Sequence, residues 1–178
     1  ADAARAIDVM EHFPDLVDRE RIGAIGHSQG GGITIQAMMM DSRIKVGVSN
    51  CGVWPEQWNK NPYNVCRTGW WIGRPLLREY CLTGKDFPTR LHEELAASAP
   101  RPILMINAMN DMQYGTDEAE MAMLEHAFAA LEREVRKVYA LYSRPENFVV
   151  ITHREGHSFI PERHRQAYDF LIRHLGRP

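Results

Sequence analysis

Cysteine, long apolar runs and signal sequences are scarce or absent in this sequence of 178 residues. Its three cysteines, Cys51, Cys66 and Cys81, fit neither an even disulfide framework nor the spacing of metal ligands. We expect free or buried thiols, which favours the reducing cytoplasm as the location. No apolar run reaches the roughly 18 residues of a membrane span, and no segment has the pattern of a signal peptide. No membrane contact is expected.

An excess of charge of either sign is also missing. The sequence has 21 Lys and Arg against 23 Asp and Glu, which gives a formal net charge of -2. A nucleic-acid-binding surface needs a concentration of basic residues, so we expect no nucleic acid as a partner. With 44% hydrophobic residues, the chain has the length and composition of a single globular domain, residues 1–178.

What the sequence does contain is an alternation of buried strands and amphipathic helices. Short apolar runs predict strands at residues 21–27, 44–50, 102–108 and 147–153. Helical periodicity and capping residues predict helices at residues 2–13, 29–40, 117–142 and 161–175. Continuous apolar strands that alternate with helices are typical of parallel sheets. The predicted fold class is therefore α/β, with a parallel sheet of about four strands and helices on both faces.

One segment, residues 53–88, interrupts this alternation and is interpreted as a cap-like insertion. The stretch just after the second strand holds all four tryptophans among Pro, Asn, Gly and Arg, without sustained periodicity. Such a segment can pack onto its own domain, or cover a ligand site at the carboxyl ends of the strands. Both interpretations stay open. Under the second, the candidate pocket residues are Trp54, Trp58, Trp70 and Trp71.

The stretch Gly26-His27-Ser28-Gln29-Gly30 matches the G-x-S-x-G motif. It lies between a predicted strand and a predicted helix, which is the context of a nucleophile elbow. We expect the two glycines to avoid collisions in a tight turn and Ser28 to be the nucleophile. The Gln29 N–H, at the start of the helix, is the expected oxyanion donor, and His27 is a candidate pocket residue. The alternative is a glycine-rich turn with an incidental serine.

A serine nucleophile needs a base and an orienting acid, which in this context follow in the order Asp or Glu, then His, each just past a strand. Asp111 follows the third predicted strand and His157 the fourth. Asp117 and Glu118 are alternative acids, and His153 is the alternative base. Two histidines four residues apart can indicate a metal, but this pair lacks the helical H-E-x-x-H pattern, so we expect none.

These motifs, taken together, resemble the α/β-hydrolase superfamily, most closely its dienelactone-hydrolase and acetyl-xylan-esterase-like branch. Successive blocks of that branch resemble residues 17–31, 41–54, 99–111 and 155–175. The resemblance implies a triad of Ser28, Asp111 and His157, no metal or organic cofactor, and cleavage of a small ester substrate, with short acyl groups such as acetyl. The branch also contains serine peptidases of the prolyl oligopeptidase type. An amidase or peptidase, and a non-catalytic interaction domain, are therefore the alternatives.

The chain departs from that family in one respect. The family's sheet usually has eight strands with the nucleophile after the fifth, whereas here the nucleophile follows the first predicted strand. The resemblance thus covers the C-terminal half of the usual domain, and the second oxyanion donor has no counterpart. The strand at residues 21–27 would lie at an open sheet edge. We expect a homodimer through this edge; a missing N-terminal partner chain or a marginally stable fragment are the alternatives.

Overall fold

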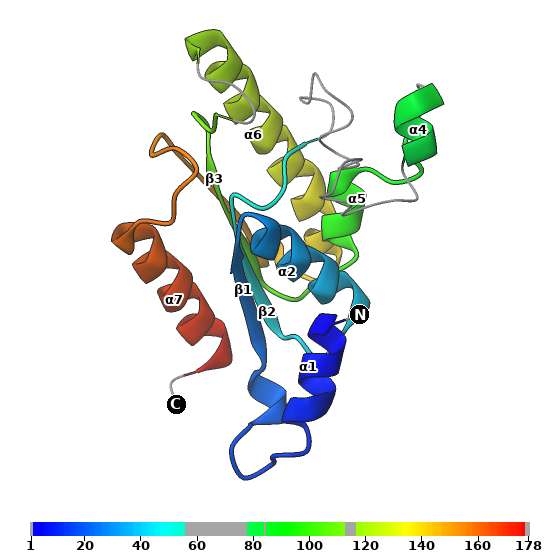
Figure 1. Cartoon of the computed structure of the whole chain (residues 1–178), viewed down its shortest axis with the longest axis vertical. Helices are drawn as coiled ribbons and strands as arrows, with labels where there is room; N and C mark the ends of the chain where they lie inside the picture. The colour runs from blue at the N-terminus through cyan, green and yellow to red at the C-terminus, as the bar shows by residue number, and fades with distance from the viewer. Residues whose placement is uncertain (1, 56–77, 84, 113–116, 177–178) are drawn as a thin grey trace.

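The computed structural model describes residues 2–55, 78–83, 85–112 and 117–176. Its centre is a parallel sheet in the order β1-β2-β3-β4 (Figure 1). The strands are β1 (Gly23–His27), β2 (Val46–Asn50), β3 (Ile103–Ala108) and β4 (Phe148–His153). Each falls within a predicted strand, and the predicted fold class is confirmed.

Helices cover both faces of this sheet. They are α1 (Asp2–Met10), α2 (Gln29–Met40), α4 (Arg78–Thr83), α5 (Leu91–Ala96), α6 (Glu118–Leu141) and α7 (Pro161–Leu175), with 3-10 turns at Arg19–Arg21 and Pro145–Asn147. Figure 1 shows α7 on one face and α2, α5 and α6 on the other. The sequence did not predict α4 and α5, because six residues are too few to show a helical period. None of the described helices has the length and apolarity to cross a bilayer.

Two apolar clusters, one on each face, explain why the strands read as continuous apolar runs. Along β3, Ile103 and Met105 belong to the cluster that α1, α2, α5 and α6 cover. The intervening Leu104 and Ile106 belong to the cluster under α7. Successive side chains of a strand point to opposite faces, so a strand that is buried on both sides reads as a mainly apolar run.

The β4 edge of the sheet is closed by side chains of α6. Arg136 Nε donates a hydrogen bond to the backbone oxygen of Phe148 over 2.9 Å. The backbone N–H of Val150 donates to Glu132 Oε1 over 3.1 Å, and Glu132 and Arg136 pair with each other at 2.9 Å. These bonds occupy backbone groups that another strand would otherwise need, so they oppose edge-to-edge pairing at β4.

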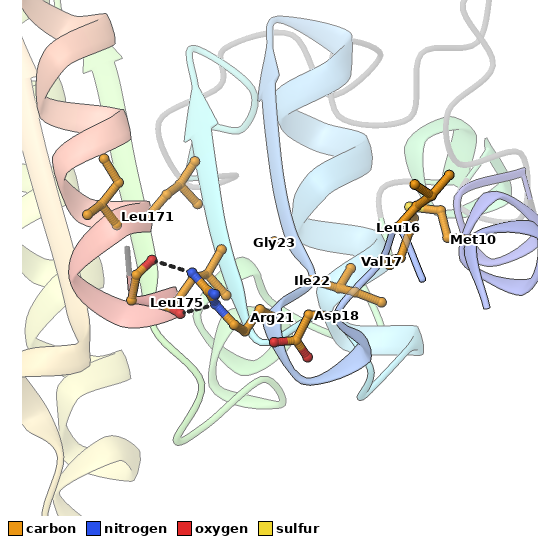
Figure 2. A pocket seen from close by; sticks show the side chains of 11 residues that line it. Met10, Leu16, Val17, Asp18, Arg21, Ile22, Gly23, Leu171 and Leu175 are labelled. Atoms are coloured by element: carbon orange, nitrogen blue, oxygen red, sulfur yellow. Dashed lines mark hydrogen bonds between the residues drawn. The ribbon is translucent and has the colours of Figure 1, made fainter. Parts of the chain in front are cut away.

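The β1 edge is open, as the sequence predicted. In the described sheet β1 has β2 as its one neighbour. A groove of about 500 Å³ adjoins it, and Figure 2 shows Leu171 and Leu175 of α7 in its lining together with Met10 and Leu16 from the N-terminal region. Large exposed apolar side chains on α7, β1 and the segment after α1 include Phe13, Leu16, Ile25 and Ile172.

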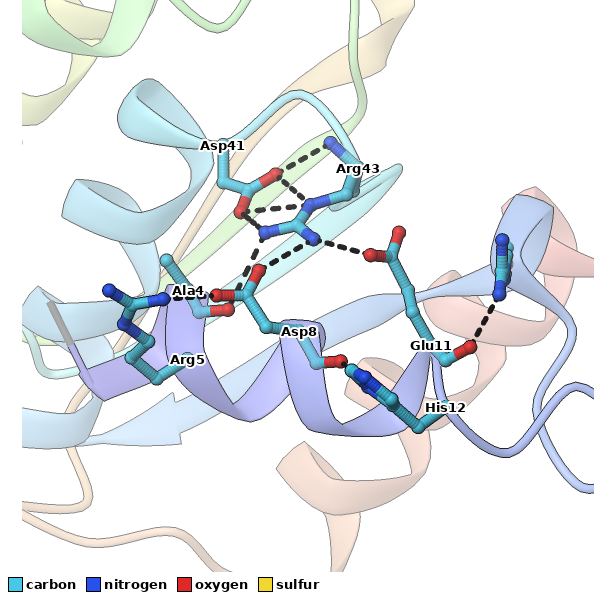
Figure 3. A network of polar contacts seen from close by, with 8 residues as sticks. Ala4, Arg5, Asp8, Glu11, His12, Asp41 and Arg43 are labelled. Carbon is cyan, nitrogen blue, oxygen red and sulfur yellow. Dashed lines mark hydrogen bonds and ion pairs between the residues drawn. The ribbon is translucent and has the colours of Figure 1, made fainter.

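A charged network around Arg43 holds α1 in place (Figure 3). The guanidinium pairs with Asp41 at 2.6 Å, and with Asp8 and Glu11 of the N-terminal region at 2.9 Å each. The hydrogen bond from Arg43 lowers the pKa of the Asp41 and Asp8 carboxyls from their usual values. Because α1 and the segment after it line part of the groove beside β1, this network fixes one wall of that groove.

Candidate active site

Ser28 lies at the turn between β1 and α2 with backbone angles of φ 56° and ψ -123°. A positive φ in a residue with a side chain is strained and is kept where the surrounding structure requires it. A Cβ on Gly26 would lie 2.1 Å from the backbone oxygen of Gly30, so only glycine fits at position 26. A Cβ on Gly30 would meet no described atom within 4 Å. The expectation that both glycines prevent collisions is right for Gly26 and wrong for Gly30.

The second close approach is at Gly31 instead. A Cβ there would lie 2.8 Å from Ser49 Oγ and 2.9 Å from the Cα of Gly52. The first turn of α2 therefore packs directly onto the backbone that follows β2. Sequence reasoning missed this residue because Gly31 stands within a run of three glycines, and no local pattern distinguishes them.

Three polar side chains meet at the carboxyl ends of the strands. Nε2 of His157 lies 2.8 Å from Oγ of Ser28, and Nδ1 of His157 lies 2.5 Å from Oδ2 of Asp111. Asp111 follows β3 and is fully buried, whereas the His157 side chain, past the end of β4, is 21% exposed. With Nδ1–H donated to the carboxylate, Nε2 is free to accept the serine proton, which is the geometry of a nucleophile, a base and an orienting acid.

The alternative acids and the alternative base have other surroundings in the structure. Asp117 caps α6, since its side chain accepts a hydrogen bond from the N–H of Glu120 over 2.8 Å. Glu118 pairs with Arg154 at 2.9 Å. His153 is buried, and burial lowers the pKa of its imidazole from 6.5. The structure thus brings Asp111 and His157 to Ser28, and gives Asp117, Glu118 and His153 other contacts.

The loop that carries His157 is held by a second side chain from the β3 end. Asn110 accepts a hydrogen bond from the N–H of Gly156 over 2.8 Å and donates one to the backbone oxygen of Arg154 over 3.1 Å. Gly156 has a φ of 68°, in the region that favours glycine. Sequence reasoning did not single out Asn110, although it directly precedes Asp111.

Gln29 is the first residue of α2. The Gly32 N–H donates to the Ser28 oxygen over 3.1 Å in the first turn, so the N–H of Gln29 precedes the helical hydrogen bonds. It lies at the positive end of the helix dipole, next to the serine. Its role as an oxyanion donor stays a prediction.

Two of the candidate pocket residues lie beside His157. The ring centroids of His27 and His157 are 4.9 Å apart, and those of Trp54 and His157 are 6.4 Å apart with the planes 19° from parallel. The other three candidates, Trp58, Trp70 and Trp71, lie outside the described residues. So does most of the predicted cap-like insertion, which stays a prediction.

One group of side chains at this site has metal-ligand chemistry. Ligand atoms of Cys51, Asp111 and His157 all lie within 4.8 Å of one another. Burial, however, raises the pKa of the Cys51 thiol to about 11, so the thiol is protonated at neutral pH. Asp111 and His157 already share a hydrogen bond. A divalent ion would have to displace the proton of the Cys51 thiol and break the hydrogen bond between Asp111 and His157. The geometry of the serine, the base and the acid requires no such ion.

Comparison with known protein sequences gives a family match and a relative. The model of the acetyl xylan esterase family (AXE1) matches residues 1–52. YtaP of Bacillus subtilis (strain 168), which is named only as a hydrolase, is 27% identical over 174 residues, which are 98% of this chain and 52% of YtaP.

Solved structures share the fold of this chain. A glucuronoyl esterase from Solibacter usitatus superposes with a TM-score of 0.77 at 19% identity, over 98% of this chain and 47% of that one. The catalytic domain of a glucuronoyl esterase from Hypocrea jecorina gives a TM-score of 0.70 at 16% identity, over 99% of this chain and 51% of that one. The fold is that of an α/β-hydrolase. In sequence, the chain is similar to the acetyl xylan esterase family over residues 1–52, and it spans about half the length of YtaP and of these solved esterases.

Proposed function

We propose that the protein is a serine hydrolase that cleaves carboxylic esters. The observation that carries the proposal is the pair of hydrogen bonds that joins Ser28 to His157 and His157 to Asp111, with Ser28 in the strained turn of a nucleophile elbow. The esterase names of the matching family and of the solved structures support the ester as the substrate class.

In the proposed reaction, Oγ of Ser28 attacks the ester carbonyl carbon while Nε2 of His157 takes the hydroxyl proton. Asp111 holds the Nδ1–H and stabilises the imidazolium, and the Gln29 N–H stabilises the oxyanion. His157 then returns the proton to the leaving alcohol, which leaves an acyl-enzyme on Ser28. Water attacks that acyl group with His157 again as base, so that a carboxylic acid is released and the serine is restored.

Short acyl groups on carbohydrate, acetyl first, are the proposed substrates. The proposal rests on the name of the matching family, acetyl xylan esterase, together with the glucuronoyl esterase structures. Amide hydrolysis is the alternative, because the same three side chains serve both reactions. Rates on p-nitrophenyl acetate and on the matched anilide distinguish the two.

A fluorophosphonate probe tests the nucleophile directly. We expect covalent labelling of the wild-type chain, and no labelling and no ester hydrolysis by Ser28→Ala. A folded wild-type chain that neither reacts with the probe nor hydrolyses any ester above background would refute the enzyme and support a non-catalytic interaction domain.

We also propose that the open β1 edge is covered, by a second copy of the chain or by an N-terminal partner chain. The support is the contrast between the closed β4 edge and the open, apolar β1 edge. Light scattering at micromolar concentration distinguishes the two: a homodimer has twice the monomer mass. The expected cytoplasmic location stays a prediction from the cysteines, and cell fractionation tests it.

A further inference from the structure

Asn50, the last residue of β2, connects the elbow with the loop that carries His157. It is fully buried, and its backbone oxygen accepts the N–H of Ser28 over 2.8 Å. Its side-chain nitrogen Nδ2 lies 2.9 Å from the backbone oxygen of Ser158 and 2.7 Å from Nδ1 of His27. One residue is therefore bonded to two segments at the carboxyl ends of the strands, the elbow at His27 and Ser28 and the loop at Ser158.

The chemistry of these partners decides the direction of both hydrogen bonds. The Ser158 carbonyl oxygen can only accept, so the side-chain atom of Asn50 that faces it is the NH2 group. That group has a second hydrogen, and its other neighbour is Nδ1 of His27. Nδ1 must then be the acceptor, which places the proton of a neutral His27 ring on Nε2.

His27 and Ser158 both lie against the proposed base. Ser158 directly follows His157 in the chain. The His27 ring lies 4.9 Å from the ring centroid of His157 and stacks on Phe159 at 6.1 Å. The side chain of Asn50 thus affects the position of His157 in two ways. It bonds the backbone of Ser158, the next residue, and it bonds the His27 ring that packs on His157.

The charge of His27 matters at this distance. His157 gains a proton in the proposed reaction, and a second cation on His27 would oppose that gain. Burial lowers the pKa of His27, the charge of His157 acts in the same direction, and together they outweigh the raising effects of Asp111 and of the Asn50 backbone. An N–H donor aimed at Nδ1 also disfavours its protonation, because the site of the added proton is already occupied by a hydrogen bond.

We propose that Asn50 is a positioning residue: its two N–H groups hold the Ser158 carbonyl and a neutral, Nε2-protonated His27 so that His157 stays within hydrogen-bond distance of Ser28. This inference rests on the proposed function for its effect on the rate. The tautomer of His27 does not depend on it.

The chain offers a matched control in Asn107 of β3. Asn107 is also fully buried, near the carboxyl end of the neighbouring strand, and among the described residues neither of its side-chain polar atoms has a hydrogen-bond partner. Asn50→Ala and Asn107→Ala remove the same group from similar surroundings, so their difference reports the two hydrogen bonds of Asn50.

Steady-state ester hydrolysis by the full chain is the first measurement. We expect Asn50→Ala to lower kcat by about tenfold to a hundredfold, since small displacements of a catalytic base cost this much, with KM within about twofold. Asn107→Ala is expected to keep kcat within about threefold. Equal losses in both variants, or an unchanged kcat in Asn50→Ala, would overturn the positioning role. A wild-type chain without activity would instead refute the proposed function.

Nitrogen-15 NMR of the histidine rings is the second measurement, and it needs no turnover. In the wild type we expect the proton of His27 on Nε2, with the signal assigned by its loss in His27→Gln. In Asn50→Asp, a substitution of nearly the same shape, the carboxylate can only accept, so the proton is expected on Nδ1. A wild-type His27 that carries its proton on Nδ1 contradicts the proposal, whatever the activity.

Discussion

The two edge strands of the described sheet, β4 and β1, differ in what lies against their outer edges. At β4, Glu132 and Arg136 of α6 bond the outer backbone groups of the strand. At β1, the neighbouring surface is a groove of about 500 Å³ with apolar side chains around it. An exposed apolar edge strand favours pairing with another chain, so the difference indicates on which side an interface is to be sought.

The same division runs through the candidate site. Ser28 follows the open strand β1, whereas Asp111 and His157 come from loops after β3 and β4 on the closed side. The acid and the base thus follow strands on the side of the sheet that α6 closes. The nucleophile follows β1, whose outer edge is paired with no other strand among the described residues.

The largest expected effect tests the closed side. We expect Asp111→Asn to lower kcat by about 10,000-fold, because an amide stabilises the wrong tautomer of the base. Asp117→Asn is the matched control, since Asp117 is a helix cap and Asn caps nearly as well. Rates with a p-nitrophenyl ester measure both. Comparable losses in the two variants would refute Asp111 as the orienting acid.

The next effect tests the elbow on the open side. Gly26→Ala places a Cβ 2.1 Å from the backbone oxygen of Gly30, and we expect it to lower the free energy of unfolding by more than about 3 kcal/mol or to prevent folding. Gly30→Ala meets no described atom and is expected to change stability by less than about 1 kcal/mol. Urea denaturation measures both. A stable Gly26→Ala chain would contradict the close approach between Gly26 and the backbone of Gly30.

A smaller effect compares the two edges directly. Ile25 on β1 and Thr152 on β4 are both exposed. If a second copy covers β1, Ile25→Lys should weaken self-association by at least about tenfold, because it places charges of the same sign together at the pair of edges. Thr152→Lys should leave it unchanged. Sedimentation equilibrium measures both constants, and an equal or greater effect of Thr152→Lys would place the interface at β4 instead.

The smallest effect is on the pH dependence of stability. Burial lowers the pKa of His153 and of His27 from 6.5 in the folded chain. Between the folded and unfolded pKa values the unfolded chain binds more protons, so the free energy of unfolding should decrease as the pH falls below about 6.5. Urea denaturation from pH 7.5 to pH 5 measures this. His153→Gln is expected to flatten the curve, and a steeper fall in that variant would contradict the assignment.

Much of the fold could be predicted because its signals are local. The strands β2 and β3 are buried on both faces and read mainly as apolar runs, whereas β1, which the sequence also predicts to be buried, has no buried residue. The helix α7 has the bounds that Pro161 and Gly176 indicated. Short elements escaped prediction, as α5 did, because six residues carry too little periodicity. The role of Gly31 also escaped, since the atoms that crowd it belong to the segment after β2.

The amino-acid sequence alone determined the order of strands and helices, the nucleophile motif and the small set of acids and histidines that follow it. These are properties of neighbouring residues and of the order of the chain. Only the tertiary structure decided which acid meets His157, how Asn50 links the elbow to the base loop, and which edge of the sheet is closed. Those contacts join residues such as Asn50 and Ser158, which are 108 positions apart, and no local period of the sequence encodes such a distance.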